Sequence, residues 1–189
     1  MFHYRSLLAS MWIAWVAYWW ISSRGAKQDQ RRESRASRAA HTVPLVIAVV
    51  LLSQPTLHVG VLSIRVLPQS VASYVAGTAM VAVGLLFSVW ARVHLGRNWS
   101  ATVTVKQGHE LVQSGPYRFV RHPIYTGLLL GLLGTAIARG DVQGFVAFAI
   151  ACAALWRKLR LEERWMQETF GDAYAKYREN VPALIPHLL

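Results

Sequence analysis

Long apolar runs, separated by short blocks rich in Arg and Lys, dominate the pattern of this chain. The stretches 6–23, 39–64 and 66–91 contain no Lys, Arg, Asp or Glu over 18, 26 and 26 residues. Since about 20 apolar residues cross a bilayer, each stretch predicts a transmembrane helix. We expect Pro55 and His58 to kink or locally hydrate the second one. A cleaved signal peptide is the alternative for 6–23, but the run is too long and no clean A-x-A site follows it.

The last apolar region predicts a helical hairpin. Residues 123–138 and 142–156 flank the turn Arg139-Gly140-Asp141. A helix over the first arm reaches only about 24 Å, less than the hydrocarbon core of roughly 30 Å. Either Arg139 therefore extends to the far interface, or the hairpin stops short of it. Gly127 and Gly131 share one helix face and allow close contact with another helix.

The basic residues predict which side of the membrane each end faces. Of the 20 Lys and Arg, 17 lie in the blocks 24–38, 92–121 and 157–178, which five spans place on one side. The positive-inside rule makes that side cytoplasmic, with the N-terminus outside. We expect the polar segment 24–41 to be a flexible or weakly helical cytoplasmic loop, with contact to anionic lipid as the alternative. We expect Trp90, Trp99, Trp156 and Trp165 to belong to the aromatic belt at this interface, with direct stacking on a substrate as the alternative. We also expect residues 165–177 to form a surface helix.

Composition supports the membrane assignment. The chain is 54% hydrophobic and 15% charged, whereas soluble chains average roughly a quarter charged residues. The net charge of +11 would suggest nucleic-acid binding, but topology already accounts for most of it, so we expect no nucleic-acid partner. The single Cys152 excludes a disulfide framework, and no Cys/His spacing predicts a metal site. The prediction is one all-α integral membrane domain, 1–189, with about five transmembrane helices and a C-terminal interfacial helix.

Candidate chemistry lies where residues 92–122 enter the hairpin. This connection of 31 residues is too long for a simple tie between helices. Pro123 suits a first helical turn, whose free N–H groups and dipole favour an anionic group beside His122. Tyr125 adds an aromatic hydroxyl, and Gly127 leaves room for a ligand. The alternative is that these side chains are interfacial anchors.

A second charged group follows the last apolar arm. Lys158 and Glu162 are spaced i, i+4, so a surface salt bridge is the simplest interpretation. Together with the start of the helix at Pro123, however, Glu162 would complete a site for a zwitterion such as an amino-acid head group.

Short motifs follow one another along the second half of the chain. They are Leu95-Gly96-Arg97-Asn98-Trp99-Ser100, Gly108-His109-Glu110-Leu111-Val112, Gly115-Pro116-Tyr117, Arg121-His122-Pro123-Ile124-Tyr125, Glu162-Glu163, Phe170-Gly171-Asp172-Ala173-Tyr174-Ala175-Lys176-Tyr177, Val181-Pro182 and Ile185-Pro186. In order and spacing these motifs resemble those of the isoprenylcysteine carboxyl methyltransferase family, which overlaps with bacterial phospholipid-methyltransferase-like membrane proteins. The resemblance implies N-terminal spans in 1–83, with the basic loop 24–41, and a methyltransferase core in 84–189. It also implies S-adenosylmethionine as the cofactor, bound at a cytoplasmic cofactor site without the soluble Rossmann fold, and no GxGxxG motif follows a strand in this sequence.

The family pattern also implies roles for single residues. Glu162 would pair with the cofactor's amino group, and the basic residue one turn earlier, here Lys158, would address the acceptor. The neighbouring bases Arg157 and Arg160 remain candidates for that role, because Lys cannot reproduce a guanidinium fork. The residues implied to line the cofactor are His109, Glu110, Leu111, Val112, Tyr117, His122, Pro123, Ile124 and Tyr125.

The acceptor stays open at this point. The family implies a lipidic or small hydrophobic acceptor, such as an isoprenylcysteine-type carboxylate, which needs no general base because it is already ionised. A phospholipid amine or a thiol must lose a proton, for which His122, His109 or Glu163 are the candidates. A non-catalytic transporter or scaffold is the other alternative. The short chain looks closer to prokaryotic members, so we expect the bacterial inner membrane.

Overall fold

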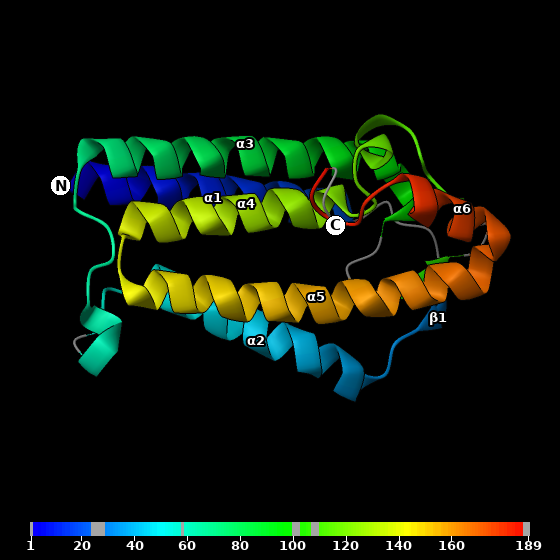
Figure 1. Ribbon diagram of the computed structural model, residues 1–189, viewed down its shortest axis with the longest axis horizontal. Helices are drawn as coiled ribbons and strands as arrows, with labels where there is room; N and C mark the ends of the chain where they lie inside the picture. Colours follow the sequence, from blue (N-terminus) through cyan, green and yellow to red (C-terminus); the bar gives the residue numbers. More distant parts are fainter. Residues whose placement is uncertain (1, 24–28, 58, 100–102, 107–109, 187–189) are drawn as a thin grey trace.

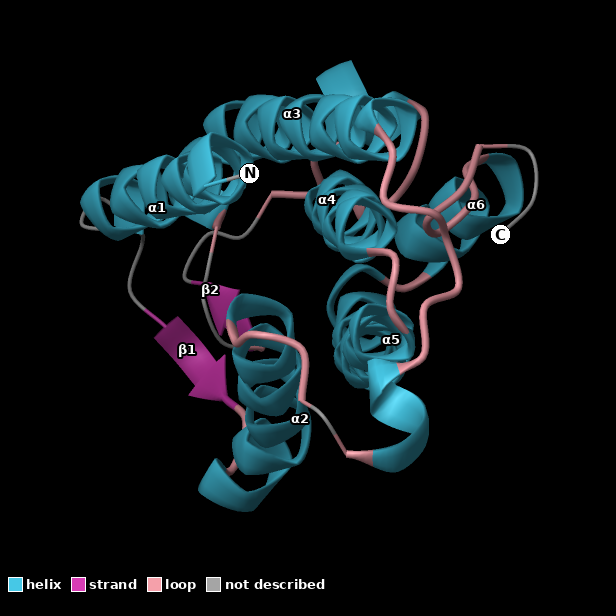
Figure 2. Cartoon of the chain, turned by 90° about the vertical axis from the view of Figure 1, so that its left-hand side faces the viewer, coloured by secondary structure: helices cyan, strands magenta, loops and turns pink. Residues whose placement is uncertain are grey.

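Five long helices form a bundle in the computed structural model, which describes residues 2–23, 29–57, 59–99, 103–106 and 110–186. Figure 1 shows α3, α4 and α5 running alongside one another, and the end-on view of Figure 2 shows α1 beside α3 and α2 beside α5. The predicted all-α membrane fold is therefore confirmed. The helices are α1 (Phe2–Ser22), α2 (Arg35–Ser53), α3 (Val71–Leu95), α4 (Pro123–Arg139) and α5 (Val142–Phe170).

Three of these helices are long and apolar enough to cross a membrane. They are α2, α3 with the 3-10 turn η3 (Gly96–Asn98) that follows it, and α5. The segment Ser6–Ser22 of α1 and the helix α4 are apolar over shorter lengths. Together these apolar helices indicate an integral membrane protein.

The second helix ends earlier than predicted. A span over 39–64 was expected, but α2 stops at Ser53 and Gln54 is extended, with ψ 154°. The cause is Pro55, since a proline disfavours the helical conformation in the residue before it. Its neighbour His58 lies outside the described residues. The connection to α3 contains a short 3-10 helix, η2 (Gly60–Ser63).

The basic segment 24–41 is more ordered than expected where the structure describes it. Strand β1 (Asp29–Arg32) pairs antiparallel with β2 (Thr104–Lys106), with Arg32 opposite Thr104, and α2 begins at Arg35. The prediction of a flexible or weakly helical loop is therefore wrong for residues 29–41. Its polar composition shows no strand periodicity, so the pairing with β2 could not be read from the segment alone.

Glycine contacts hold α3 against α4. A Cβ atom added at Gly84 would lie 2.4 Å from the carbonyl oxygen of Gly127, so only glycine permits this approach. Gly77 and Gly134 form a second contact of the same kind. The predicted close helix contact is confirmed. The further expectation that Gly127 makes room for a ligand is wrong, because the residue faces α3.

The hairpin turn is anchored within the protein. Arg139 forms an ion pair of 2.9 Å with Asp141 and donates hydrogen bonds to the carbonyl oxygens of Leu52 and Gln54 at the end of α2. Asp141 in turn accepts a hydrogen bond of 2.9 Å from the amide of Gly144 and caps α5. The Arg139 side chain thus joins the hairpin turn to the end of α2.

The last helix breaks at a different place from the one predicted. α5 continues through Trp165 to Phe170, Gly171 adopts a positive φ of 51°, and α6 (Asp172–Asn180) follows. The predicted surface helix 165–177 is therefore wrong as one element, because a glycine in this conformation ends a helix. Trp165 is buried within α5 rather than part of an aromatic belt.

Candidate active site

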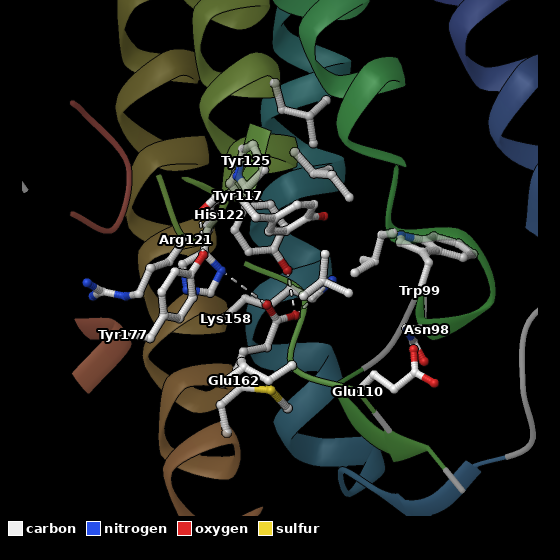
Figure 3. A pocket seen from close by; sticks show the side chains of 18 of the residues that line it. Asn98, Trp99, Glu110, Tyr117, Arg121, His122, Tyr125, Lys158, Glu162 and Tyr177 are labelled. Atoms are coloured by element: carbon white, nitrogen blue, oxygen red, sulfur yellow. Dashed lines mark hydrogen bonds and ion pairs between the residues drawn. The ribbon is translucent and has the colours of Figure 1, made fainter. Parts of the chain in front are cut away.

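A cavity of about 400 Å³ lies at the end of the bundle near α6 (Figure 3). Its walls come from all five long helices, α6 and the connection between α3 and α4. Most of the residues selected from the sequence meet there, although they are spread over more than 50 positions of the chain. Those that line the cavity are Glu110, Leu111, Val112, Tyr117, His122, Pro123, Ile124, Tyr125, Lys158 and Glu162.

Glu162 is the centre of the polar end of the cavity. Its Oε1 atom accepts a hydrogen bond of 2.6 Å from the hydroxyl of Tyr125. The Nζ atom of Lys158 lies 4.0 Å from the same oxygen, and the Nδ1 atom of His122 lies 3.6 Å from Oε2. The expected i, i+4 pair of Lys158 and Glu162 is thus present, and it faces the cavity.

Two aromatic rings stack beside this carboxylate. The His122 and Tyr125 rings are 5.6 Å apart at an angle of 2°, and Lys158 places its Nζ atom 5.5 Å from the Tyr125 ring centre. Pro123 occupies the first turn of α4, as predicted, so His122 precedes the helix and Tyr125 points from it. The helix start therefore orients both rings toward Glu162 on α5.

The segment that follows α6 is hydrogen-bonded to the N-terminal end of α4. The amide of Arg121 donates to the carbonyl of Pro182 at 2.8 Å, and the amide of His122 donates to Ala183 at 3.0 Å. Thr126 adds a hydroxyl hydrogen bond of 2.7 Å to the carbonyl of Leu184. The chain after α6 thus fixes the position of His122.

Glu163 lies behind the cavity and does not line it. Its buried carboxylate accepts a hydrogen bond of 2.7 Å from Nε of Arg121, and the Nε2 atom of His122 lies 3.3 Å away. Arg121 also donates to the carbonyl of Val181. Glu163 therefore joins α5 to the C-terminal segment, and its candidate role as a base at the cavity has no geometric support.

The pKa of His122 is raised above its ordinary value. Burial opposes protonation, but the hydrogen bonds and negative charges of Glu162 and Glu163 outweigh it. Since the imidazole stands between two carboxylates, the protonated form is the one that this environment favours.

The candidate residue Arg160 is not brought to the cavity. Arg160 is exposed, with its guanidinium 5.9 Å from the ring centre of Trp156, and it does not line the cavity. A spacing of two residues places Arg160 on the helix face opposite Lys158, which is the physical reason. The candidate cofactor residue His109 lies outside the described residues.

The apolar wall was missed from the sequence. Trp15 and Trp19 of α1 line the cavity with stacked rings 4.3 Å apart, and Trp99 meets Trp19 edge-on at 6.0 Å. Trp15 is fixed by a hydrogen bond of 2.8 Å from its indole to Ser88. Trp99 is buried, so its predicted place in the aromatic belt is wrong, whereas Trp156 is 43% exposed. Only the spacing of Trp15 and Trp19 by one helical turn could have suggested a shared face.

The family model for phospholipid methyltransferase matches residues 72–173, more than half of the chain. The chain belongs to this family. Its matched part contains α3 except for Val71, all of α4 and α5, and the connection that carries Glu110 to Tyr117. The predicted resemblance to isoprenylcysteine carboxyl methyltransferases is likewise confirmed by individual relatives.

Two such relatives are named isoprenylcysteine O-methyltransferases. The protein from Schizosaccharomyces pombe is 36% identical over 102 residues, which are 51% of this chain and 42% of that protein. Protein B from Arabidopsis thaliana is 28% identical over 116 residues, 58% of this chain and 57% of that protein. The chain spans about half the length of the curated relatives it matches.

A solved structure has the same fold. It is that of a eukaryotic intramembrane Ras methyltransferase, an isoprenylcysteine carboxyl methyltransferase, with a TM-score of 0.55 and 21% identity. The match covers 81% of this chain and 52% of the other. This family member therefore shares the membrane fold of that enzyme.

Proposed function

We propose that the protein is a methyltransferase of the membrane that uses S-adenosylmethionine and a lipidic acceptor carrying a carboxylate. The observation that carries the proposal is the cavity around Glu162, built from residues of the family motifs. Membership of the phospholipid methyltransferase family supports the reaction class.

The residues around the cavity fit the cofactor. Its volume of about 400 Å³ falls within the range of small-molecule sites. Glu162 would hold the amino group of the cofactor's amino-acid moiety. Leu111, Val112 and Ile124 would contact the adenosine with apolar surface. When bound, S-adenosylmethionine would supply its sulfonium methyl group, to which an acceptor would bond in line while S-adenosylhomocysteine leaves.

The protein contributes alignment and exclusion of water. Tyr125, bonded to Glu162, and the stacked His122 hold the polar end in one arrangement. The tryptophans Trp15, Trp19 and Trp99 keep the other wall apolar. Charged reactants that lose water in such a site react faster when they are also held in line.

The charges favour an acceptor that is already ionised. Two of the candidate bases, His122 and Glu163, lie in the part of the chain that the structure describes. They contact each other, and Arg121 also binds Glu163. Neither is arranged to remove a proton from an amine or a thiol. Lys158, at the cavity wall, would instead attract an acceptor carboxylate.

The distribution of charge supports a cytoplasmic active site. Arg121 and Lys158 lie at the cavity end of the bundle, whereas Arg65 donates a hydrogen bond to the carbonyl of Arg139 at the hairpin end. Under the positive-inside rule the cavity end faces the cytoplasm, and a bacterial inner membrane is the setting we propose.

The proposal is tested by transfer of labelled methyl from S-adenosylmethionine. Purified protein is incubated with a lipid extract and with a panel of prenylated thiols that carry a free or an amidated carboxyl group. We expect base-labile methyl ester on the free carboxylates, and none with Glu162→Gln. Label on a phospholipid amine or a thiol would assign the alternative acceptor, and no cofactor binding by folded protein would favour a transporter or scaffold.

A further inference from the structure

Glu33 hydrogen-bonds to the connection between α3 and α4. In the sequence it lies outside the residues that the family model matches. Its backbone amide donates to the carbonyl of Val103 at 3.1 Å, and its Oε1 atom accepts from the amide of Val103 at 3.2 Å. One residue thus engages both backbone polar groups of Val103. This contact continues the pairing of β1 with β2.

His41 links Glu33 to α5. Its Nε2 atom lies 3.5 Å from Oε1 of Glu33, and its Nδ1 atom lies 3.4 Å from a guanidinium nitrogen of Arg157. Because arginine only donates, Nδ1 must accept and the proton lies on Nε2, facing Glu33. Arg157 also donates to the carbonyl of Ser37 at 3.1 Å. The contacts thus run from Glu33 through His41 to Arg157, the residue before Lys158.

Val103 is placed where it can set two walls of the cavity. It is buried and packs against Trp165 and Leu161 of α5. Along the chain it lies between Trp99 and the segment 110–112, and both line the cavity. Holding Val103 therefore restricts the position of both walls.

The burial of Glu33 and His41 costs free energy of folding. Glu33 and His41 are 7% and 2% exposed, and the Oε2 atom of Glu33 is buried without a hydrogen-bond partner among the described residues. Burying a carboxylate costs free energy unless its hydrogen bonds are complete, so this contact of Glu33 is weak evidence of a stabilising role. Neither residue lines the cavity, which leaves a geometric role.

We propose that Glu33 and His41 are positioning residues, which hold Val103 so that the cofactor-binding walls of the cavity are formed before the cofactor binds. The proposal rests on the proposed function, because it concerns the site for S-adenosylmethionine. It assigns a role to the N-terminal segment 29–41, which otherwise serves only as a connection.

The test compares three variants in binding of S-adenosylhomocysteine by calorimetry and in methyl transfer. Glu33→Ala should raise the Kd and the cofactor KM about tenfold, with kcat at saturating cofactor changed less than about threefold, since the walls reform once the ligand is bound. Glu33→Gln, which can still accept from Val103, should restore most of the affinity. Glu168→Gln is the control, because it removes only the exposed ion pair of Glu168 with Arg31 on β1.

Hydrogen exchange of the wild-type protein provides a second test that does not depend on a variant folding. S-adenosylhomocysteine should protect the amides of 31–33 and 103–106 together with those of 110–112. Protection of 110–112 alone, or unchanged affinity in Glu33→Ala, would overturn the inference. Failure of the wild-type protein to bind would instead contradict the proposed function.

Discussion

The hydroxyl of Tyr125 donates a hydrogen bond of 2.6 Å to the carboxylate of Glu162, joining α4 to α5 at the polar end of the cavity. The two residues are 37 positions apart in the chain. Their contact helps to orient a carboxylate that still faces the cavity, as binding a cationic amino group requires.

Tyr125→Phe should weaken cofactor binding without unfolding the protein. A hydrogen bond to a charged group contributes about 1.5 to 3 kcal/mol, so we expect the Kd for S-adenosylhomocysteine to rise about tenfold or more. Calorimetry in detergent measures the effect. Tyr74→Phe, on the first turn of α3 and away from the cavity, is the matched control, and equal losses in both variants would contradict the role of Tyr125.

Lys158 and Arg160 should differ sharply although both are basic and two residues apart. Lys158→Met removes a cation at the cavity wall and should raise the acceptor KM about tenfold, whereas Arg160→Met changes only an exposed contact with Trp156. Steady-state methyl transfer with varied acceptor measures both. A larger effect of Arg160→Met would reverse this assignment.

The state of His122 predicts how stability depends on pH. Its pKa is raised in the folded protein, so the folded protein binds this proton more tightly than the unfolded chain does. The resulting stabilisation is fully present below the unfolded pKa of about 6.5 and is lost as the pH rises through the higher folded pKa. Thermal unfolding in detergent should show this decline, and His122→Gln should remove it. A decline that persists in the variant would point to another group.

Gly84 predicts the cost of separating α3 from α4. In Gly84→Ala the new Cβ atom would lie 2.4 Å from the carbonyl oxygen of Gly127, so the helices must move apart. Overpacking of this kind costs about 1 to 3 kcal/mol. The control is Val83→Ala, at the preceding position of the same helix, where the side chain is 58% exposed. Thermal midpoints measured in the same detergent should fall only for Gly84→Ala.

Local patterns were sufficient for the helices and for much of the site. Uninterrupted apolar runs indicated the spans, Pro123 marked a helix start, and the spacing of Lys158 and Glu162 placed both on one face. The same rule of spacing places Arg160 on the opposite face, so its exclusion was available from the sequence. The family motifs then indicated which loop residues would join them.

Contacts between distant segments could not be read in this way. The strand 29–32 has no alternating pattern, and its pairing with 104–106 depends on how the helices bring the two segments together. The positions of Trp15 and Trp19 at the cavity depend likewise on the packing of α1 against α3. The break at Gly171 needed a positive φ, which glycine permits but does not require.

The central claim is that Glu162 belongs to a cofactor site, and its neighbour Glu163 offers a matched comparison. Titration of the detergent-purified protein with S-adenosylhomocysteine, alongside Glu162→Gln and Glu163→Gln, tests it most directly. Glu162→Gln should abolish measurable binding in protein that still unfolds cooperatively on heating. Glu163→Gln should lower the midpoint, because it leaves the buried Arg121 without its carboxylate, and should bind more tightly than Glu162→Gln. Wild-type protein that is folded but does not bind, or Glu162→Gln that binds like the wild type, would contradict the account.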